Sequence, residues 1–223
     1  MTARKLVVFD VDGTLVDSQD HIVAAMTAAF DAVSRPLPAR EVVLSIVGLS
    51  LGQAIARLLP DCATPEQEAA TQAYKTAFGQ LRAGHLSPLF PGAADMLAAL
   101  GARDDVLLGI ATGKSRRGLM HILEAHGLSG CFASCQVADD HPSKPHPSML
   151  LAALAETGVD ARDAVMLGDT TYDIEMARAA GMPAIGVSWG YHRPDALRAA
   201  GAGRVLDAFG DLHAALADLW GAS

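Results

Sequence analysis

The most constraining feature of this chain is an alternation of short, β-branched apolar runs with alanine-rich segments of helical periodicity. The apolar runs predict buried strands at 6–9, 106–111, 164–167, 184–187 and, as a shorter run, 204–206. Helical segments that each stop at a glycine lie at 93–100, 115–126 and 147–157. Near-continuous apolar strands joined by helical crossovers indicate a parallel sheet covered on both faces. The pattern therefore predicts an α/β fold with a Rossmann-like parallel sheet, which would bind ligands beyond the carboxyl ends of its strands.

Residues 16–87 interrupt this alternation with a purely helical pattern. Apolar residues at helical spacing form two stripes, which are Ile22, Met26 and Phe30, and then Leu51, Ile55 and Leu58. Thr64-Pro65-Glu66-Gln67 has the pattern of a capping box that starts a helix. We interpret 16–87 as a small α-helical domain inserted into an α/β core of residues 1–15 and 88–223. The alternative is a single helical layer that belongs to the main core.

Composition narrows the class of protein. Among the 223 residues, 17 are lysine or arginine and 25 are aspartate or glutamate, and the net charge of −8 disfavours nucleic acid as a partner. No apolar run approaches the roughly 20 residues needed to cross a membrane, and the amino terminus lacks a secretory pattern. The three cysteines, Cys62, Cys131 and Cys135, show no CxxC spacing, so reduced, packed thiols are expected. A cytoplasmic location is the expectation, and the sequence does not indicate the oligomeric state.

Two carboxylates follow the first predicted strand directly, in Asp10-Val11-Asp12-Gly13-Thr14. Because residues two apart in a strand project to the same side, Asp10 and Asp12 are expected side by side at the carboxyl edge of the sheet. Gly13 allows the backbone to turn sharply there. The alternative is that the Asp-Gly pair only opens a turn.

Two further segments follow strands or precede helices at the same edge. Thr112-Gly113 places a hydroxyl and backbone amides just before a predicted helix amino terminus, where anions are favoured. Lys144 lies between prolines in a stiff segment ahead of a predicted helix, and this segment could present its ammonium group at a fixed place. Thr and Gly are also ordinary turn residues, and most lysines are solvated surface charges.

A second acidic segment is Gly168-Asp169, with Asp173 one helical turn further on. Asp173 could simply cap its helix. Taken with Asp10 and Asp12, however, four carboxylates at two strand ends would repel one another in a partly desolvated cleft, so we expect a cation among them. Ligands that are all oxygen indicate Mg²⁺.

In motif order and spacing, the chain resembles the haloacid-dehalogenase-like superfamily, and in particular its phosphoglycolate-phosphatase-like branch. The resemblance covers nearly the whole chain, and the helical insertion looks like the mobile cap of that branch. The motifs that carry it are Asp10-Val11-Asp12-Gly13-Thr14-Leu15, Thr112-Gly113, Lys144-Pro145, Gly168-Asp169 with Asp173, and the tail around Ser188-Trp189-Gly190-Tyr191.

The resemblance implies a Mg²⁺-dependent phosphatase that hydrolyses a small phosphomonoester, similar to 2-phosphoglycolate, through an aspartyl-phosphate intermediate. It implies that Asp10 is the nucleophile and that Asp12 is the general acid and base. Thr112, Gly113 and Lys144 would bind the phosphate oxygens.

The same resemblance implies the metal ligands. Asp10, the main-chain carbonyl of Asp12, and Asp169 would hold the ion, and Asp173 is the remaining candidate ligand. Asp173 would alternatively orient Lys144 or a metal-bound water.

Residue identities favour one branch of the superfamily over others. Superfamily dehalogenases and phosphonate hydrolases lack the aspartate at the position of Asp12, and the latter use a cap lysine, for which only Lys75 is available here. A sugar-phosphate mutase of the β-phosphoglucomutase type keeps both aspartates and remains an alternative. A noncatalytic phosphate-ligand-binding protein on the same fold is another. By the same resemblance, the loop 48–53 would meet the leaving group of the substrate; the alternative is that Gly48 ends one helix and Ser50 begins the next. Arg57 could reach a substrate carboxylate or lie on the surface.

Overall fold

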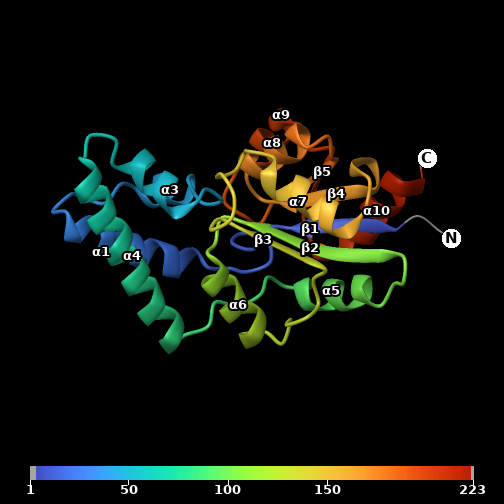
Figure 1. The fold of residues 1–223 in the computed structure, drawn as a ribbon, viewed down its shortest axis with the longest axis horizontal. Helices are drawn as coiled ribbons and strands as arrows, with labels where there is room; N and C mark the ends of the chain where they lie inside the picture. Colours follow the sequence, from blue (N-terminus) through green and yellow to red (C-terminus); the bar gives the residue numbers. More distant parts are fainter. Residues whose placement is uncertain (1–3, 222–223) are drawn as a thin grey trace.

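The computed structural model describes residues 4–221 and contains a six-stranded parallel sheet of order β3-β2-β1-β4-β5-β6 (Figure 1). The strands are β1 (Lys5–Phe9), β2 (Val106–Thr112), β3 (Ser134–Val137), β4 (Ala164–Gly168), β5 (Ala184–Val187) and β6 (Arg204–Leu206). Every neighbouring pair is parallel. The predicted α/β fold with a parallel sheet is therefore confirmed, and all five predicted strands are present.

The edge strand β3 was not predicted, because its sequence is partly polar. Ser134 and Gln136 are buried in it, and both donate hydrogen bonds to one carboxylate oxygen of Glu156, at 2.6 and 2.8 Å. Buried polar groups cost little when their hydrogen bonds are satisfied. A tertiary partner in a distant helix thus permits a strand that lacks the apolar signature.

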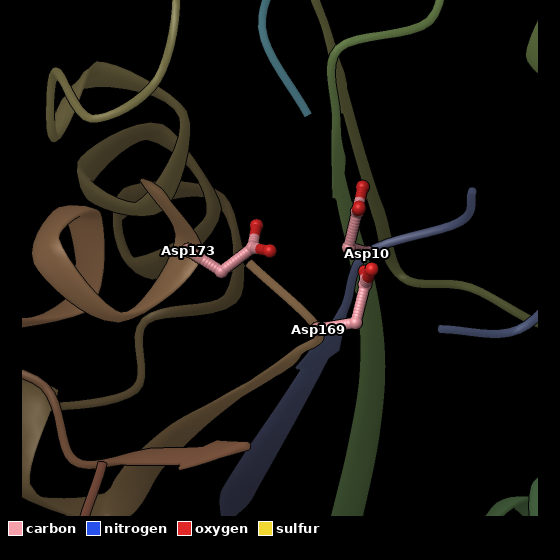
Figure 2. Close-up of side chains that lie close together, drawn as sticks. All are labelled: Asp10, Asp169 and Asp173. Atoms are coloured by element: carbon pink, nitrogen blue, oxygen red, sulfur yellow. The ribbon is translucent and has the colours of Figure 1, made fainter. Parts of the chain in front are cut away.

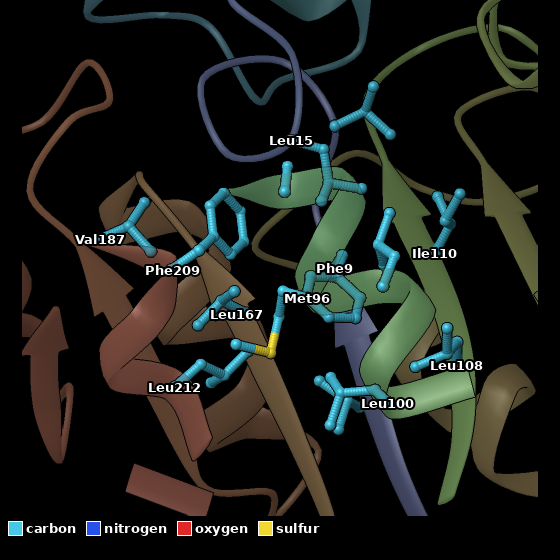
Figure 3. Close-up of a cluster of buried hydrophobic side chains, with 14 of the residues drawn as sticks. Phe9, Leu15, Met96, Leu100, Leu108, Ile110, Leu167, Val187, Phe209 and Leu212 are labelled. Atoms are coloured by element: carbon cyan, nitrogen blue, oxygen red, sulfur yellow. The ribbon is translucent and has the colours of Figure 1, made fainter. Parts of the chain in front are cut away.

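Helices cover both faces of the sheet. Side chains of β1 alternate, so Val7 and Phe9 pack in one hydrophobic cluster and Leu6 and Val8 in the other. The first cluster, shown in Figure 3, includes side chains of α5 (Ala93–Gly101), α6 (Arg116–Ala125) and α10 (Leu212–Gly221). The second includes side chains of α7 (Ser148–Thr157), α8 (Thr171–Ala179) and α9 (Pro194–Ala200). The predicted helices after 93, 115 and 147 agree with α5, α6 and α7.

The segment 16–87 is helical, and we call it the helical segment. Its helices are α1 (Gln19–Ala32), α2 (Arg40–Leu44), α3 (Leu51–Leu58) and α4 (Thr64–Gly84), and they share a separate hydrophobic cluster. The predicted capping box needs a correction. The residue that caps α4 is Ala63, whose amide donates to the Glu66 carboxylate at 3.0 Å, so Thr64 is the first helical residue and supplies no cap.

The helical segment lies beyond one end of the sheet (Figure 1). The two connections to the core run side by side, because the Asp17 amide donates to the Pro88 carbonyl and the Phe90 amide donates to the Leu15 carbonyl, each at 2.9 Å. The division into two domains stays a prediction.

Two expectations from the composition concern membrane-spanning segments and the cysteines. None of the helices within residues 4–221 is long and apolar enough to span a membrane. Cys62 and Cys135 are half-buried and pack against hydrophobic clusters, as expected for packed thiols. The same expectation is wrong for Cys131, which is exposed directly after the turn that contains Gly130.

Candidate active site

Three carboxylates converge at the carboxyl edge of the sheet. Asp10 follows β1, Asp169 follows β4, and Asp173 lies in the first turn of α8. Their side chains turn toward one another (Figure 2), and one oxygen from each lies within 4.8 Å of the others. Because β1 and β4 are adjacent parallel strands, their ends bring residues far apart in the chain to one place. The structure thus brings together three of the four acidic residues singled out from the sequence.

Asp10 is buried and poorly satisfied. It is 1% exposed, and neither carboxylate oxygen has a hydrogen-bond partner with good geometry among the described residues. The Lys144 ammonium group lies 2.8 Å from Oδ1 as an ion pair. Burial, opposed by Lys144 and reinforced by Asp173, raises the pKa of Asp10 to about 7. The ion pair with Lys144 therefore only partly offsets the cost of burying this charge.

Lys144 is also buried, at 2% exposed, which the sequence did not indicate. Its ammonium group donates to Asp173 Oδ1 at 2.6 Å and thus lies between two carboxylates. Burial alone would lower the pKa of Lys144, but the attraction of Asp10 and Asp173 outweighs it and raises the pKa. Lys144 is therefore held as a cation in the interior, beside Asp10.

Asp173 makes two sets of contacts, one that caps helix α8 and one with Lys144. Its Oδ2 accepts hydrogen bonds from the Thr170 amide at 3.1 Å and the Thr170 hydroxyl at 2.7 Å, which caps α8. Its Oδ1 binds Lys144. The capping interaction fixes the carboxylate, and the fixed carboxylate positions the ammonium group.

Asp169 is fixed from both sides. The Thr14 hydroxyl donates to its Oδ1 and the Tyr191 amide donates to its Oδ2, each at 2.9 Å. Burial, and then the charges of Asp10 and Asp173, raise its pKa. A side chain at position 190 would collide with the Asp169 side chain, so glycine is required there. The segment Gly190-Tyr191 thus serves as a support for Asp169.

Asp12 does not join the acidic cluster, which corrects the expectation of four neighbouring carboxylates. Lys114 Nζ lies 2.7 Å from each of its oxygens, and the Ser18 hydroxyl also donates to it. Lys114 comes 102 positions later in the chain, at the end of β2. The backbone turns at Gly13, with a φ of 86°, but it is the cation from a neighbouring strand that satisfies the Asp12 charge.

Lys114, Ser18 and Tyr191 contact the aspartates of the site and were not predicted as site residues from the sequence. Lys114 comes two positions after Thr112, close enough to a predicted strand end to have been counted as a candidate. Tyr191 contributes a backbone amide to Asp169, and its phenol oxygen lies 3.3 Å from the Ser18 hydroxyl. A contribution of the backbone amide carries no sequence signature.

Thr112 and Gly113 lie in the same cavity as Asp10 and Asp12. Thr112 is 1% exposed, and its hydroxyl accepts a hydrogen bond from the Lys114 amide at 3.2 Å. A Cβ on Gly113 would stand 2.6 Å from the Leu49 carbonyl oxygen, so the helical segment approaches the core backbone closely here.

The cavity has a volume of about 580 Å³ and lies between the carboxyl edge of the sheet and the helical segment. The loop 48–52 lines it, as does Lys75, whereas Arg57 is exposed and does not line it. The loop is attached to the core, because the Ser50 amide donates to the Ser143 hydroxyl at 2.8 Å. The Tyr172 hydroxyl donates to the Ser45 carbonyl at 3.1 Å and adds a second contact. Any ligand that touches Asp10 therefore also faces the helical segment.

The donor set fits a hard divalent cation. Asp10, Asp169 and Asp173 offer only carboxylate oxygens, which Mg²⁺ and similar ions prefer. Asp10 has two buried oxygens without hydrogen bonds, and its pKa is raised because nothing nearby fully offsets the charge. A cation at this place would supply the missing compensation.

Comparison with known proteins agrees with this arrangement. The model for haloacid dehalogenase-like hydrolases matches residues 7–187. The chain belongs to this family of hydrolases. The expected enzyme class and family are thereby confirmed, and the matched region includes every residue of the acidic cluster.

Curated relatives of this haloacid dehalogenase-like hydrolase carry phosphatase names. It is 38% identical over 216 residues to "Probable phosphatase IndB" of Dickeya dadantii, covering 94% of this chain and 92% of the relative. It is 34% identical over 222 residues to a phosphoglycolate phosphatase of Rhodospirillum rubrum, covering 93% and 89%. Among solved structures, a hydrolase from Pseudomonas syringae superposes with a TM-score of 0.86 at 28% identity, covering 96% of this chain and 99% of that one.

Proposed function

We propose that this protein is a Mg²⁺-dependent phosphatase that hydrolyses a small phosphomonoester through an aspartyl-phosphate intermediate on Asp10. The observation that carries the proposal is the environment of Asp10. The Asp10 carboxylate is buried and its oxygens lack hydrogen bonds, so it is suited to act as a nucleophile. The buried ammonium group of Lys144, 2.8 Å away, is suited to bind a phosphate oxygen beside it. The phosphatase names of the relatives support the same reaction.

In the first half-reaction, an Asp10 carboxylate oxygen attacks the phosphorus of the substrate in line with the ester oxygen. The bond from Asp10 to phosphorus forms while the bond from phosphorus to the ester oxygen breaks. The departing oxygen takes a proton from Asp12, and the alcohol product leaves. Asp12 is suited to this task because it follows Asp10 by two residues and lines the same cavity.

In the second half-reaction, a water molecule attacks the phosphorus of the aspartyl-phosphate. Asp12, now ionised, takes a proton from that water, and the bond between phosphorus and Asp10 breaks. Inorganic phosphate leaves and both aspartates return to their initial states. Lys114 and Ser18 contact Asp12 in the structure, so they would stabilise its ionised form between the two proton transfers.

The remaining residues supply charge compensation. Lys144 would bind an equatorial phosphate oxygen, with Thr112 and the backbone amide of Gly113 beside it. Asp10, the Asp12 carbonyl and Asp169 would hold Mg²⁺, with Asp173 as a positioning group for Lys144 or a further ligand. When bound, the ion would offset the charge of the acidic cluster and of the phosphate.

The substrate that we propose is a small phosphorylated metabolite similar to 2-phosphoglycolate. Both curated relatives described above bear a phosphatase name, and the name of one of them includes phosphoglycolate. The helical segment would act as a mobile cover over the cavity, and a cytoplasmic location stays a prediction. A nucleic-acid partner remains disfavoured by the charge balance, and a membrane partner by the lack of an apolar run of spanning length in the sequence.

The test is an assay of phosphate release from a panel of phosphate esters, with Mg²⁺ and then with an excess of chelator. Asp10→Asn removes the nucleophile while keeping the size of the side chain. Asp163→Asn is the matched control, because Asp163 pairs with Lys5 at 2.8 Å at the opposite end of β1. We expect hydrolysis by the unmodified protein and by Asp163→Asn, lost on chelation, and none by Asp10→Asn.

Other outcomes would overturn the proposal. Substantial phosphate release by Asp10→Asn would exclude Asp10 as the nucleophile. Conversion of a hexose 1-phosphate to its 6-phosphate without phosphate release would identify a mutase instead. Tight binding of esters without turnover would identify a noncatalytic binding protein.

A further inference from the structure

One wall of the cavity is a single stripe of helix α4. Its members recur at spacings of three and four residues, so they share one face of the helix. They are Thr71, Tyr74, Lys75, Phe78, Gly79 and Arg82. The stripe therefore faces the cavity along about three turns of the helix.

The middle of this stripe is aromatic. Tyr74 and Phe78 lie with ring centroids 5.7 Å apart and planes inclined by 18°. Lys75 and Arg82 lie one turn to either side of Phe78. Neither cation has an ion-pair partner within residues 4–221. The stripe thus offers an apolar surface flanked by unpaired positive charge.

The apolar surface continues beyond α4. Met26 of α1 and Ile46 and Val47, which precede the loop 48–52, also line the cavity and are otherwise buried. An apolar wall gains free energy only when apolar atoms, rather than water, cover it. Asp10 and Asp12 line the same cavity, so a ligand with its phosphate at Asp10 would place its leaving group in the space that this wall borders.

Two glycines enlarge the cavity. A Cβ on Gly52 of α3 or on Gly79 of α4 would meet no atom within 4 Å, and both residues line the cavity. Gly79 lies inside a helix, where glycine costs about 1 kcal/mol relative to alanine. The cavity of about 580 Å³ lies in the range of about 300–1,000 Å³ that ligands of drug size occupy.

These features do not match a two-carbon acid. The carboxylate of glycolate could meet a cation of the stripe, but the molecule would leave the half-buried rings of Tyr74 and Phe78 in contact with water. Arg57, the cation considered for that carboxylate, lies outside the cavity, and Lys114 is already paired with Asp12. The wall instead matches a leaving group with a body as large as a ring.

We propose that the α4 stripe is a leaving-group subsite that selects phosphomonoesters whose alcohol carries an apolar or aromatic ring. This inference rests on the proposed phosphatase function, and it replaces the substrate similar to 2-phosphoglycolate with an ester of a larger alcohol. Tyr74 and Phe78 contact the ring, and Lys75 and Arg82 meet polar groups at its edge. The unfilled space at Gly79 and Gly52 accommodates the bulk of the ring.

The test compares esters of primary alcohols, so that the leaving oxygen is chemically similar in each. The substrates are 2-phosphoglycolate, glucose 6-phosphate, benzyl phosphate and uridine 5′-phosphate, which separate a small acid, a polar ring, a simple aromatic ring and a nucleoside. Each is assayed for kcat/KM with Mg²⁺ in the unmodified protein, Gly79→Leu and Gly84→Leu. Gly84 ends the same helix, also has open space at its Cβ position, and does not line the cavity.

We expect the unmodified protein to prefer an aromatic ester, benzyl or nucleoside, over 2-phosphoglycolate and glucose 6-phosphate by at least about tenfold in kcat/KM. Gly79→Leu fills the space and should reduce the ratio of aromatic ester to 2-phosphoglycolate by about tenfold or more. Gly84→Leu should leave that ratio unchanged. Gly52→Leu fills the cavity from α3 and should act like Gly79→Leu, which guards against a folding defect specific to α4.

The outcomes of this assay separate the phosphatase function from the leaving-group subsite. If no ester is hydrolysed, the proposed phosphatase function fails. If esters are hydrolysed but 2-phosphoglycolate or glucose 6-phosphate is preferred, the inference about the leaving group fails while the phosphatase function stands. Equal loss of all substrates in Gly79→Leu and Gly52→Leu would likewise overturn the assignment of the stripe.

Discussion

Removal of divalent ions should make the stability of this protein unusually sensitive to pH, because of Asp10. The pKa of Asp10 in the folded protein is raised to about 7, mainly by burial, from a reference value of 3.8. Between these values, the folded state binds more protons than the unfolded state. Stability therefore falls as the pH rises through this window, since the carboxylate must ionise in an environment that does not compensate its charge.

The size of the effect follows from the two pKa values. Each pKa unit is worth about 1.4 kcal/mol, so the whole window corresponds to about 4 kcal/mol and the part between pH 5 and 8 to about 3 kcal/mol. For a chain of this length, each kcal/mol changes Tm by about 2–4 °C. We therefore expect Tm in the presence of chelator to fall by about 6–12 °C between pH 5 and 8 on account of Asp10. The raised pKa of Asp169 acts in the same direction.

Thermal unfolding followed by circular dichroism at several pH values, with chelator, measures this directly. Asp10→Asn imitates the protonated side chain, so its Tm should decline much less and should exceed that of the unmodified protein at pH 8. Asp163→Asn should retain the full decline, because Asp163 lies outside the acidic cluster. Added Mg²⁺ should raise Tm more at pH 8 than at pH 5. A profile that is the same in Asp10→Asn and in the unmodified protein would refute the reasoning.

Further substitutions test individual contacts. Gly190→Ala should reduce kcat by a factor of about one hundred or more, since the added Cβ would displace the Asp169 side chain. The circular dichroism spectrum should change little, and normal activity of the variant would contradict the supporting role of Gly190-Tyr191. Lys114→Met removes the cation that binds both oxygens of Asp12 and should lower kcat about tenfold to a hundredfold, with a smaller effect on KM. If Lys114 served only to bind substrate, steady-state kinetics would show a large change in KM and a small change in kcat. Leu100→Ala leaves a cavity at a fully buried position in the hydrophobic cluster of Figure 3 and should lower the free energy of unfolding by about 2–5 kcal/mol in urea titrations. A loss below about 1 kcal/mol would show instead that the core relaxes around the cavity.

Much of the fold could be predicted because its signals are local. Apart from Lys5 and Thr112 at strand ends, β1 and its neighbours β2 and β4 consist of apolar residues and glycine, which is typical of a parallel sheet buried on both faces. Strand β3 could not be predicted in this way, because Ser134 and Gln136 are stabilised by a glutamate that only the tertiary structure brings close.

The same distinction applies to the site. The positions of Asp10 and Asp169 at strand ends followed from local sequence, and the topology then placed them together. The pairing of Asp12 with Lys114 depends on a contact between neighbouring strands, so spacing alone placed Asp12 wrongly in the acidic cluster. The burial of Lys144 also depends on tertiary packing, since a proline-rich segment is compatible with either a buried or an exposed lysine.

The central claim is that the Asp10 carboxylate becomes phosphorylated during turnover. The most direct measurement is to quench the protein with acid during turnover of an ester in Mg²⁺, reduce it with borohydride, and locate homoserine by tandem mass spectrometry, because borohydride reduces an acyl phosphate but not a free carboxylate. We expect substrate-dependent homoserine at position 10 and none in Asp10→Asn. Substrate-dependent homoserine at another aspartate, or turnover that leaves position 10 unmodified at every quench time, would contradict it.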